Sequence, residues 1–278
     1  MNFINFWACT IDRFCYKIRA KEKVRMSIYR EPLYYELAFS FVKPAKQIDL
    51  FEKLIKKYSA LKAKSFLDMG CGPSPQLLEL AKRGYACTGT DLCPDMLAYL
   101  VKKAKDKNLT IKTKKTDFTD FISKEKYDFA MMMMGTIGYI DSGKKLLSHL
   151  KSVGKCLNPG GLYLIENFRT TRSREHLFSP QTWLVKRKYL TIRVFYKIDI
   201  KDRLQGLETE TILLEVEDHG KKYLFKQQAS IKIFSPLEFL EAIKESKMFD
   251  FLGWFNRETL RSLEKPKIGN YTLLRRKL

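Results

Sequence analysis

Short apolar runs alternate with helical stripes through the first two thirds of the chain. Stretches that are mostly apolar and typical of buried strands occur at 64–69, 85–91, 127–134 and 162–168, and a more polar strand is predicted at 110–114. Between them, apolar residues recur at helical spacing in 75–82, 96–105 and 144–157. Strands that alternate with helices in this way predict an α/β fold with a parallel, doubly wound sheet.

The pattern changes after residue 168. Residues 189–200, 207–217 and 222–234 each alternate apolar with polar positions and are rich in β-branched and aromatic residues. This predicts an antiparallel meander inserted into the parallel fold. Ser235-Pro-Leu-Glu238 then reads as a capping box that starts a helix, and 249–255 and 271–275 predict two strands that return to the main sheet.

The N-terminal quarter of the chain is predicted to be helical. In 27–62 an apolar stripe runs along Leu50, Phe51, Leu54, Ile55 and Tyr58, and Pro44 is expected to separate two helices. Residues 1–25 interleave apolar and basic side chains as a basic amphipathic helix does. Such a helix contacts a membrane surface, packs on its own domain, or is an extension upstream of a start at Met26.

A glycine turn with an acid twenty residues beyond it is the strongest chemical signal. Gly70 and Gly72 follow the first strand and precede a helix, an arrangement that brings backbone close to a nucleotide-like ligand. By itself this pattern also fits a structural turn. Asp91 closes the second strand at the offset where a carboxylate accepts from both hydroxyls of a ribose, which favours a ligand.

Charge and composition only partly narrow the class of protein and its partners. The 278 residues are 45% hydrophobic and 30% charged, as in an ordered globular protein, and carry a net charge of +21. That balance favours anionic partners such as nucleic acid, but the lysines are spread along the whole chain, so we favour a lysine-rich surface without a dedicated partner.

Cysteine and histidine spacing predicts neither disulfides nor a metal site. The six cysteines form no C-x-x-C pair and the three histidines are scattered, so we expect a reduced cytoplasmic protein with no bound metal. The four methionines at 131–134 are expected to be a central strand buried on both faces. No apolar run approaches the roughly 18 residues of a membrane span.

Four motifs, taken together, resemble class I S-adenosylmethionine-dependent methyltransferases. They match in order and spacing throughout 64–168, and are Leu67-Asp-Met-Gly-Cys-Gly72, Thr88-Gly-Thr-Asp91-Leu-Cys-Pro-Asp-Met96, Thr116-Asp117-Phe118 and Leu157-Asn-Pro-Gly-Gly161. Beyond that core, the segments 26–51, 134–139 and 234–239 resemble the small-molecule branch of the family, which includes glycine and amino-sugar N-methyltransferases. Because that branch's cap begins near Met26, the resemblance favours residues 1–25 being extra.

The resemblance implies a fold and a division of the chain. The fold is a Rossmann-like seven-stranded methyltransferase sheet with an antiparallel β-meander inserted after strand five. We divide the chain into an N-terminal extension (1–25), a helical cap (26–62) and an S-adenosylmethionine-binding core (63–168). An inserted β subdomain (169–234) and a C-terminal helix with the terminal strand pair (235–278) follow. The inserted sheet is expected to cover the pocket or to join two chains in a homodimer.

The resemblance also implies which residues hold S-adenosyl-L-methionine. Gly70 and Gly72 approach its methionine part and ribose, Asp68 orients the turn, and Asp91 binds the ribose hydroxyls. Leu92 and Met96 flank adenine, Asp117 accepts from its amino group and Phe118 supplies a backbone contact. Met133 and Met134 lie beside the sulfonium, and Tyr35 closes over the cofactor from the cap.

This chain departs from the family pattern at two points. The third glycine of the family is Ser74, followed by Pro75, which predicts a stiffer turn. The arginine often used for the cofactor carboxylate has no clear counterpart, and Lys43 or Lys46 is the substitute we expect.

The acceptor side is predicted from strand ends, because ligands of such sheets bind at the carboxyl edge. Our candidates for substrate binding are Thr136, Tyr139 and Asn167, which follow strand ends, together with Tyr34 of the helical cap. An amine acceptor needs no strong base, whereas a hydroxyl does. The catalytic residue is therefore left open, with His176 and Tyr139 as candidates.

The predicted function is methyl transfer to an amine or hydroxyl of a small molecule. The alternatives are methylation of RNA and a non-catalytic S-adenosylmethionine-binding partner protein. Against a nucleobase substrate, strand four does not end in Asn/Asp-Pro-Pro-Tyr and no Pro-Cys nucleophile follows it, although ribose or tRNA modification stays open.

Overall fold

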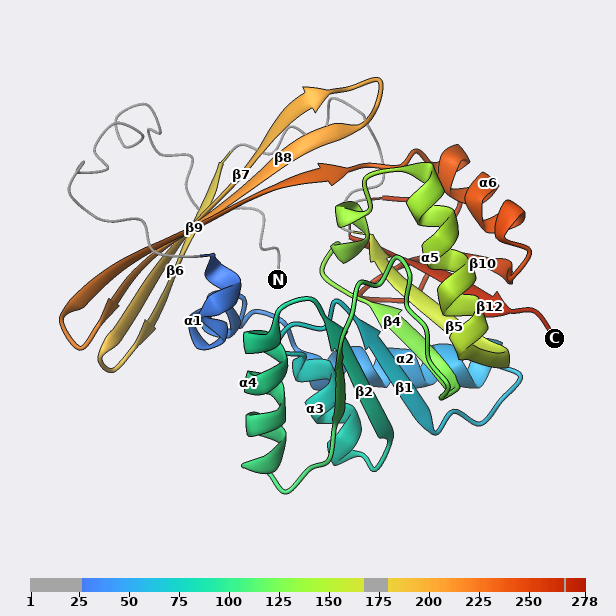
Figure 1. The fold of residues 1–278 in the computed structure, drawn as a ribbon, viewed down its shortest axis with the longest axis horizontal. Helices are drawn as coiled ribbons and strands as arrows, with labels where there is room; N and C mark the ends of the chain where they lie inside the picture. The colour runs from blue at the N-terminus through green and yellow to red at the C-terminus, as the bar shows by residue number, and fades with distance from the viewer. Residues whose placement is uncertain (1–26, 168–179, 268) are drawn as a thin grey trace.

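The computed structural model describes residues 27–167, 180–267 and 269–278. In it, the central sheet and its helices form three layers (Figure 1). The helices are η1 Ile28–Arg30, α1 Pro32–Ala38, α2 Pro44–Tyr58, α3 Pro75–Lys82, α4 Pro94–Lys105, η2 Thr136–Tyr139, α5 Gly143–Cys156 and α6 Pro236–Ser246. The strands are β1 Ser65–Met69, β2 Ala86–Asp91, β3 Lys112–Lys115, β4 Tyr127–Met132, β5 Leu157–Asn167, β6 Gln181–Arg187, β7 Leu190–Asp202, β8 Leu207–Asp218, β9 Lys221–Lys232, β10 Phe249–Asn256, β11 Ser262–Leu263 and β12 Asn270–Arg276.

The main sheet has the order β11-β10-β12-β5-β4-β1-β2-β3. Its strands β1 to β5 pair in parallel, and β12 runs antiparallel between β5 and β10. Parallel pairing places the carboxyl ends of β1, β2 and β4 at one edge, where the loops after them meet. The predicted parallel sheet and the return of two C-terminal strands are therefore confirmed.

Both faces of this sheet are covered by helices. Apolar side chains of α2, α3 and α4 form one buried cluster with the strands, and those of α5 and α6 form a second cluster on the other face. The methionines of β4 divide between the clusters, since Met131 faces the first and Met132 the second. This alternation confirms a central strand that is buried on both sides.

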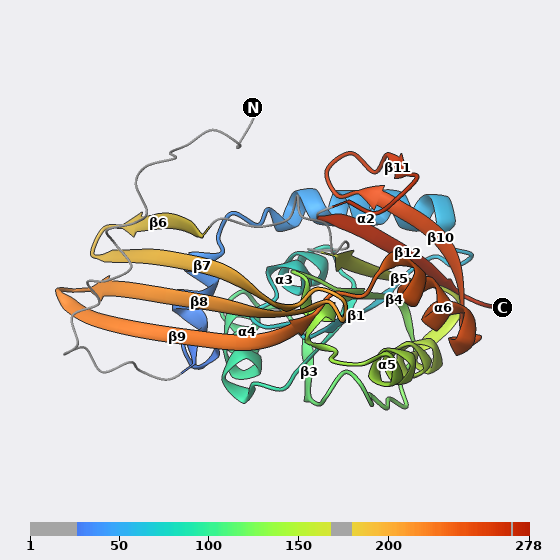
Figure 2. The same cartoon turned by 90° about the horizontal axis from the view of Figure 1, so that it is seen from above.

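The inserted segment forms a separate four-stranded antiparallel sheet, β6-β7-β8-β9. Figures 1 and 2 show it beside the main sheet, with α1 against it. Ile28 and Ala38 of the N-terminal cap share a buried cluster with Ile192 and Leu214 of this sheet. The cap therefore joins the inserted sheet to the core.

Several boundaries differ from the sequence prediction. Strand β6 was not predicted, because it is a short edge strand in which only Trp183 and Val185 pack inward. Strand β5 begins at Leu157 directly after α5, so the Asn158-Pro-Gly-Gly161 segment lies within the strand, although it does end the helix as expected. The predicted capping box of α6 is present, with Ser235 and Glu238 bonded to each other's backbone N–H.

Some predictions fall outside the described residues. These are the amphipathic extension at 1–25, Cys9, Cys15, and His176. Within the described ranges, the helices are all too short or too polar to span a bilayer.

A buried histidine ties α5 to the loop after β3. His149 is fully buried; its Nδ1 lies 2.8 Å from the Phe118 carbonyl oxygen and its Nε2 lies 2.7 Å from the Tyr163 hydroxyl. The carbonyl only accepts, so Nδ1 carries the proton and Nε2 accepts from Tyr163. Burial lowers the pKa of His149 to about 4.

This lowered pKa predicts a pH-dependent stability. Because the folded-state pKa lies below the unfolded value of about 6.5, the stabilising contribution is complete above pH 6.5 and is lost as the pH falls toward 4. The shift in pKa corresponds to a loss of about 3 kcal/mol in the free energy of unfolding over that pH range. Urea unfolding of the wild type and of His149→Gln at pH 7 and pH 4.5 measures it.

The variant should lose less stability than the wild type between these two pH values. Asp68, whose pKa burial raises to about 7, contributes in the opposite direction, but both proteins retain it. Equal losses in both proteins would contradict a role for His149 in this pH dependence.

Candidate functional site

The glycine turn connects β1 to α3 through left-handed backbone. Gly70 and Gly72 have φ of +66° and +52°, and Ser74 follows with φ of +31°. The Ser74 hydroxyl donates to Asp68 Oδ2 at 2.6 Å and accepts from the Leu77 N–H at 3.2 Å. The residue that replaces the third glycine thus caps α3 and links the turn to Asp68.

The two glycines have different surroundings. A Cβ on Gly70 would lie 2.5 Å from Cγ2 of Thr136, whereas a Cβ on Gly72 would meet nothing within 4 Å. Gly70 is therefore required by the close approach of the loop after β4. Gly72 leaves open space, which suits a ligand that approaches the backbone.

Asp91 links the glycine turn to the loop after β2. Its Oδ2 accepts from the Gly72 N–H at 2.8 Å, and its Oδ1 accepts from the Cys93 N–H at 2.8 Å. Burial raises the pKa of Asp91, and the amides of Cys93 and Gly72 act in the opposite direction. Each carboxylate oxygen keeps a lone pair for a further donor.

Asp117 and Phe118 form the next part of the same edge. Asp117 Oδ1 accepts from both the N–H and the hydroxyl of Thr119, at 2.7 and 2.8 Å. The Phe118 carbonyl is bonded to His149, as described above. Leu92 is 55% exposed and Met96 is buried. Beside Asp91, apolar surface is therefore provided by one exposed and one buried side chain.

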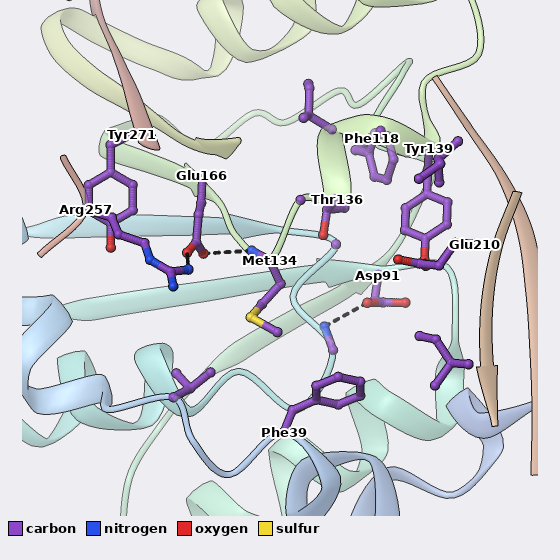
Figure 3. A pocket seen from close by; sticks show the side chains of 18 of the residues that line it. Phe39, Asp91, Phe118, Met134, Thr136, Tyr139, Glu166, Glu210, Arg257 and Tyr271 are labelled. Carbon is purple, nitrogen blue, oxygen red and sulfur yellow. Dashed lines mark hydrogen bonds and ion pairs between the residues drawn. The ribbon is translucent and has the colours of Figure 1, made fainter. Parts of the chain in front are cut away.

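A cavity of about 1300 Å³ opens in front of these residues (Figure 3). Its walls come from the cap, the carboxyl edge of the main sheet, the inserted sheet and the segment after β10. Pockets for one drug-sized ligand usually measure about 300–1,000 Å³. The volume is therefore sufficient for two ligands side by side.

The loop after β4 is held by a buried carboxylate at one end of the cavity. Met134 has a left-handed φ of +57°, and its N–H donates to Oε2 of Glu166 at 2.9 Å. Glu166 is 2% exposed and its Oε1 pairs with the Arg257 guanidinium at 3.3 Å. This bond and the neighbouring one from Gly135 N–H to the Glu166 carbonyl fix the loop in place.

A second carboxylate, Glu210 of β8, lies at the other end of the cavity. It accepts from the hydroxyls of Tyr139 and Tyr196, and Tyr139 also contacts the hydroxyl of Tyr29. Burial raises the pKa of Tyr139 far above its usual value, so its phenol is protonated at neutral pH. Tyr139 is accordingly a poor general base.

Most of the predicted site residues lie around the cavity. Those that line it are Tyr35, Gly70, Gly72, Asp91, Leu92, Met96, Asp117, Phe118, Met134, Thr136 and Tyr139, and Lys43 and Lys46 line it as well. Asp68 and Met133 are buried behind the lining.

Tyr34 is directed away from this cavity. Its hydroxyl donates to Asp218 at 2.8 Å and its ring packs on Tyr223 and Phe225, so the structure does not support substrate binding by Tyr34. Asn167 ends β5 opposite Asn270 at the expected edge, but its side chain lies outside what the structure describes.

Sequence reasoning missed Glu166, Arg257, Glu210 and Tyr29. A charged residue within an otherwise apolar strand was a usable signal for Glu166. The others come from segments that no local pattern connects to the glycine turn.

The packing of Gly70 against Thr136 predicts a coupled pair of substitutions. Gly70→Ala should lose about 2–4 kcal/mol of stability, from left-handed strain and from the clash with Cγ2. Thr136→Ser removes Cγ2 and keeps the hydroxyl that donates to the Met133 carbonyl at 2.7 Å. The double variant, compared by thermal or urea unfolding, should recover about 1–2 kcal/mol of the loss. Purely additive effects of the two substitutions would refute the contact.

Comparison with known proteins agrees with this geometry. Residues 66–161 match a family model described as a methyltransferase domain. The chain is 29% identical over 104 residues to a dTDP-3-amino-3,4,6-trideoxy-alpha-D-glucopyranose N,N-dimethyltransferase of Streptomyces venezuelae, covering 37% of this chain and 42% of that protein. The chain spans about half the length, or less, of the curated relatives it matches first.

Two solved structures cover nearly the whole described fold. One is an S-adenosylmethionine-dependent methyltransferase from Clostridium acetobutylicum, with a TM-score of 0.74 at 16% identity over 88% of this chain and 97% of that one. The other is the sugar N-methyltransferase KedS8 from Streptoalloteichus, with a TM-score of 0.72 at 17% identity over 88% and 93%. The chain therefore contains a methyltransferase domain and has the fold of the S-adenosylmethionine-dependent methyltransferases.

Proposed function

We propose that the protein transfers a methyl group from S-adenosyl-L-methionine to an amine of a small molecule. The observation that carries this proposal is the position of Asp91. Its carboxylate joins the glycine turn to the loop after β2 and lines a cavity with room for a second ligand. A dinucleotide-like cofactor needs such a carboxylate at this edge for its ribose hydroxyls.

The residues around Asp91 suit each part of this cofactor. We assign the ribose to Asp91 and the open side of Gly72, and the adenine to Leu92, Met96 and Phe118. Asp117 uses Oδ1 for Thr119, and we assign its Oδ2 to the adenine amino group.

The methionine end of the cofactor would lie toward Met134. Lys43 and Lys46 also line the cavity, and we assign one of their ammonium groups to the cofactor carboxylate. Tyr35, whose ring packs on Tyr29 and Phe39, would cover the ligand from the cap.

When bound, the cofactor supplies a methyl group already activated by its sulfonium. The protein's own contribution is then mainly to hold the acceptor in line with that group. The Glu166 bonds keep Met134 and Gly135 in one conformation, and Thr136 packs on Gly70, so this wall of the cavity is rigid. The inserted sheet closes the opposite wall and limits access of water.

An amine is favoured over a hydroxyl for two reasons. The relatives named above include proteins described as N-methyltransferases, and a neutral amine attacks without a strong base. None of the residues seen to line the cavity in the described ranges is a histidine. The four cysteines that the structure describes are unpaired, which suits the reducing cytosol where we expect the protein to act.

Replacing Asp91 by Asn tests the cofactor assignment. Asparagine still accepts a hydrogen bond but has neither the charge nor the second acceptor oxygen. We expect the affinity for S-adenosylmethionine and for S-adenosylhomocysteine to fall roughly ten- to a hundredfold, which is the usual contribution of one or two charged hydrogen bonds. Isothermal titration calorimetry measures it directly.

The matched control is Glu125→Gln, which likewise removes one negative charge, but at an exposed position on the surface beside Lys112. It should leave both affinities unchanged. Full affinity in Asp91→Asn would refute the site as assigned.

Methyl transfer itself can be detected without knowing the acceptor. Methyl-labelled S-adenosylmethionine, incubated with the protein and fractionated cell extract, should label small metabolites and not RNA. Label found only in RNA would overturn the small-molecule proposal while leaving the cofactor site intact.

A further inference from the structure

Four polar side chains from three parts of the chain meet at the end of the cavity formed by the inserted sheet. We call Tyr29 of η1, Tyr139 of η2, Tyr196 of β7 and Glu210 of β8 the Glu210 cluster. Tyr139 donates to Oε2 of Glu210 at 3.0 Å, Tyr196 donates to Oε1 at 2.8 Å, and the hydroxyls of Tyr29 and Tyr139 lie 2.8 Å apart. All four residues line the cavity, and Figure 3 shows Tyr139 and Glu210 beside Asp91.

The positions of the hydroxyl protons follow from these contacts. Each phenol has one proton to donate, and a carboxylate is the stronger acceptor, so Tyr139 and Tyr196 point their protons at Glu210. Tyr139 must then accept from Tyr29. These bonds use the proton of every hydroxyl, so the cluster offers the cavity only lone pairs. A ligand that contacts it has to be a hydrogen-bond donor.

The charge of the cluster points the same way. None of the ion pairs formed among the described residues involves Glu210, so this carboxylate at the cavity wall has no cationic partner within those residues. The phenols do not share it, because burial raises the pKa of Tyr29 to about 12 and that of Tyr139 further.

Aromatic side chains adjoin this carboxylate. Tyr139 and Tyr196 donate to it, and Tyr29 packs on Tyr35 with ring centroids 5.7 Å apart. These four rings line the cavity. The faces of such rings attract cations, and a carboxylate among them strengthens the attraction.

We propose that the Glu210 cluster is a binding site for the ammonium form in which the acceptor amine arrives. The neutral nitrogen that attacks the methyl group forms when this ammonium passes one proton to the Glu210 carboxylate. That this ammonium belongs to the methyl acceptor rests on the proposed function, whereas the binding of a cation by the cluster does not. An ammonium group offers the N–H donors and the positive charge that the cluster lacks, whereas a neutral hydroxyl supplies a donor without charge. The inserted sheet thereby selects the acceptor by charge as well as closing the cavity.

The test compares two ligands of similar shape that differ mainly in charge. Cyclohexylammonium and cyclohexanol are titrated into the protein at pH 7, with and without saturating S-adenosylhomocysteine, and binding is followed by ligand-observed NMR. We expect the ammonium to bind at least roughly tenfold more tightly than the alcohol, as a charged hydrogen bond or a desolvated cation–π contact predicts. Glu210→Gln should reduce this preference to less than twofold.

The matched control is Glu215→Gln on the same strand. Glu215 is exposed and faces Arg193 at 3.7 Å, away from the cavity lining, so the ammonium preference should persist in this variant. Thermal unfolding of both variants checks that each is folded.

Equal binding of the two ligands to the wild type would overturn the proposal, as would a preference that survives in Glu210→Gln. Loss of S-adenosylhomocysteine affinity in Glu210→Gln would also overturn it and place the cluster in the cofactor site. Failure of the wild type to bind S-adenosylhomocysteine would instead count against the proposed function, and the ammonium preference would still be measurable in the free protein.

Discussion

The two hydrogen bonds of the Asp91 carboxylate determine how the rest of the site is arranged. One joins it to the glycine turn after β1, and the other joins it to the loop after β2. The bond from Gly72 depends on parallel pairing of these strands in a fixed register, with Met69 opposite Thr90, whereas the bond from Cys93 is local to the loop after β2. A shift by one residue would turn Asp91 to the other face of the sheet. The register of the core is thus also the geometry of the candidate cofactor site.

The cavity in front of Asp91 is completed by segments that are not part of this core. The cap packs on the inserted sheet through Ile28 and Ala38, and both contribute residues to the cavity wall. Neither segment has a large core of its own, and each depends on the other for burial of its apolar face. The shape of the cavity therefore depends on contacts between segments that are far apart in the sequence.

The sequence predicted the core well because its signals are local. The strand, glycine turn and helix around Gly70 and the capping box at Ser235 each depend on residues within a few positions of one another, and Asp91 was found from its fixed offset of about twenty residues from the glycine turn. Tyr34 does not line the cavity because its hydroxyl and ring pack on the inserted sheet, a contact between distant segments that no local pattern shows. Glu210 and Arg257 were missed because their roles depend on distant pairing, and strand β6 because an edge strand needs only two inward side chains.

The distribution of charge between surface and cavity bears on the substrate. The chain carries a net charge of +21, yet the described residues that line the cavity include five acids and five bases: Asp91, Asp117, Glu166, Glu210 and Glu258, and Lys43, Lys46, Lys145, Lys232 and Arg257. The charges of the described lining residues therefore balance, and the basic excess does not come from them. It is not a reason to expect an anionic acceptor, and the local field at Glu210, which carries no paired cation among the described residues, acts more directly on whatever binds there.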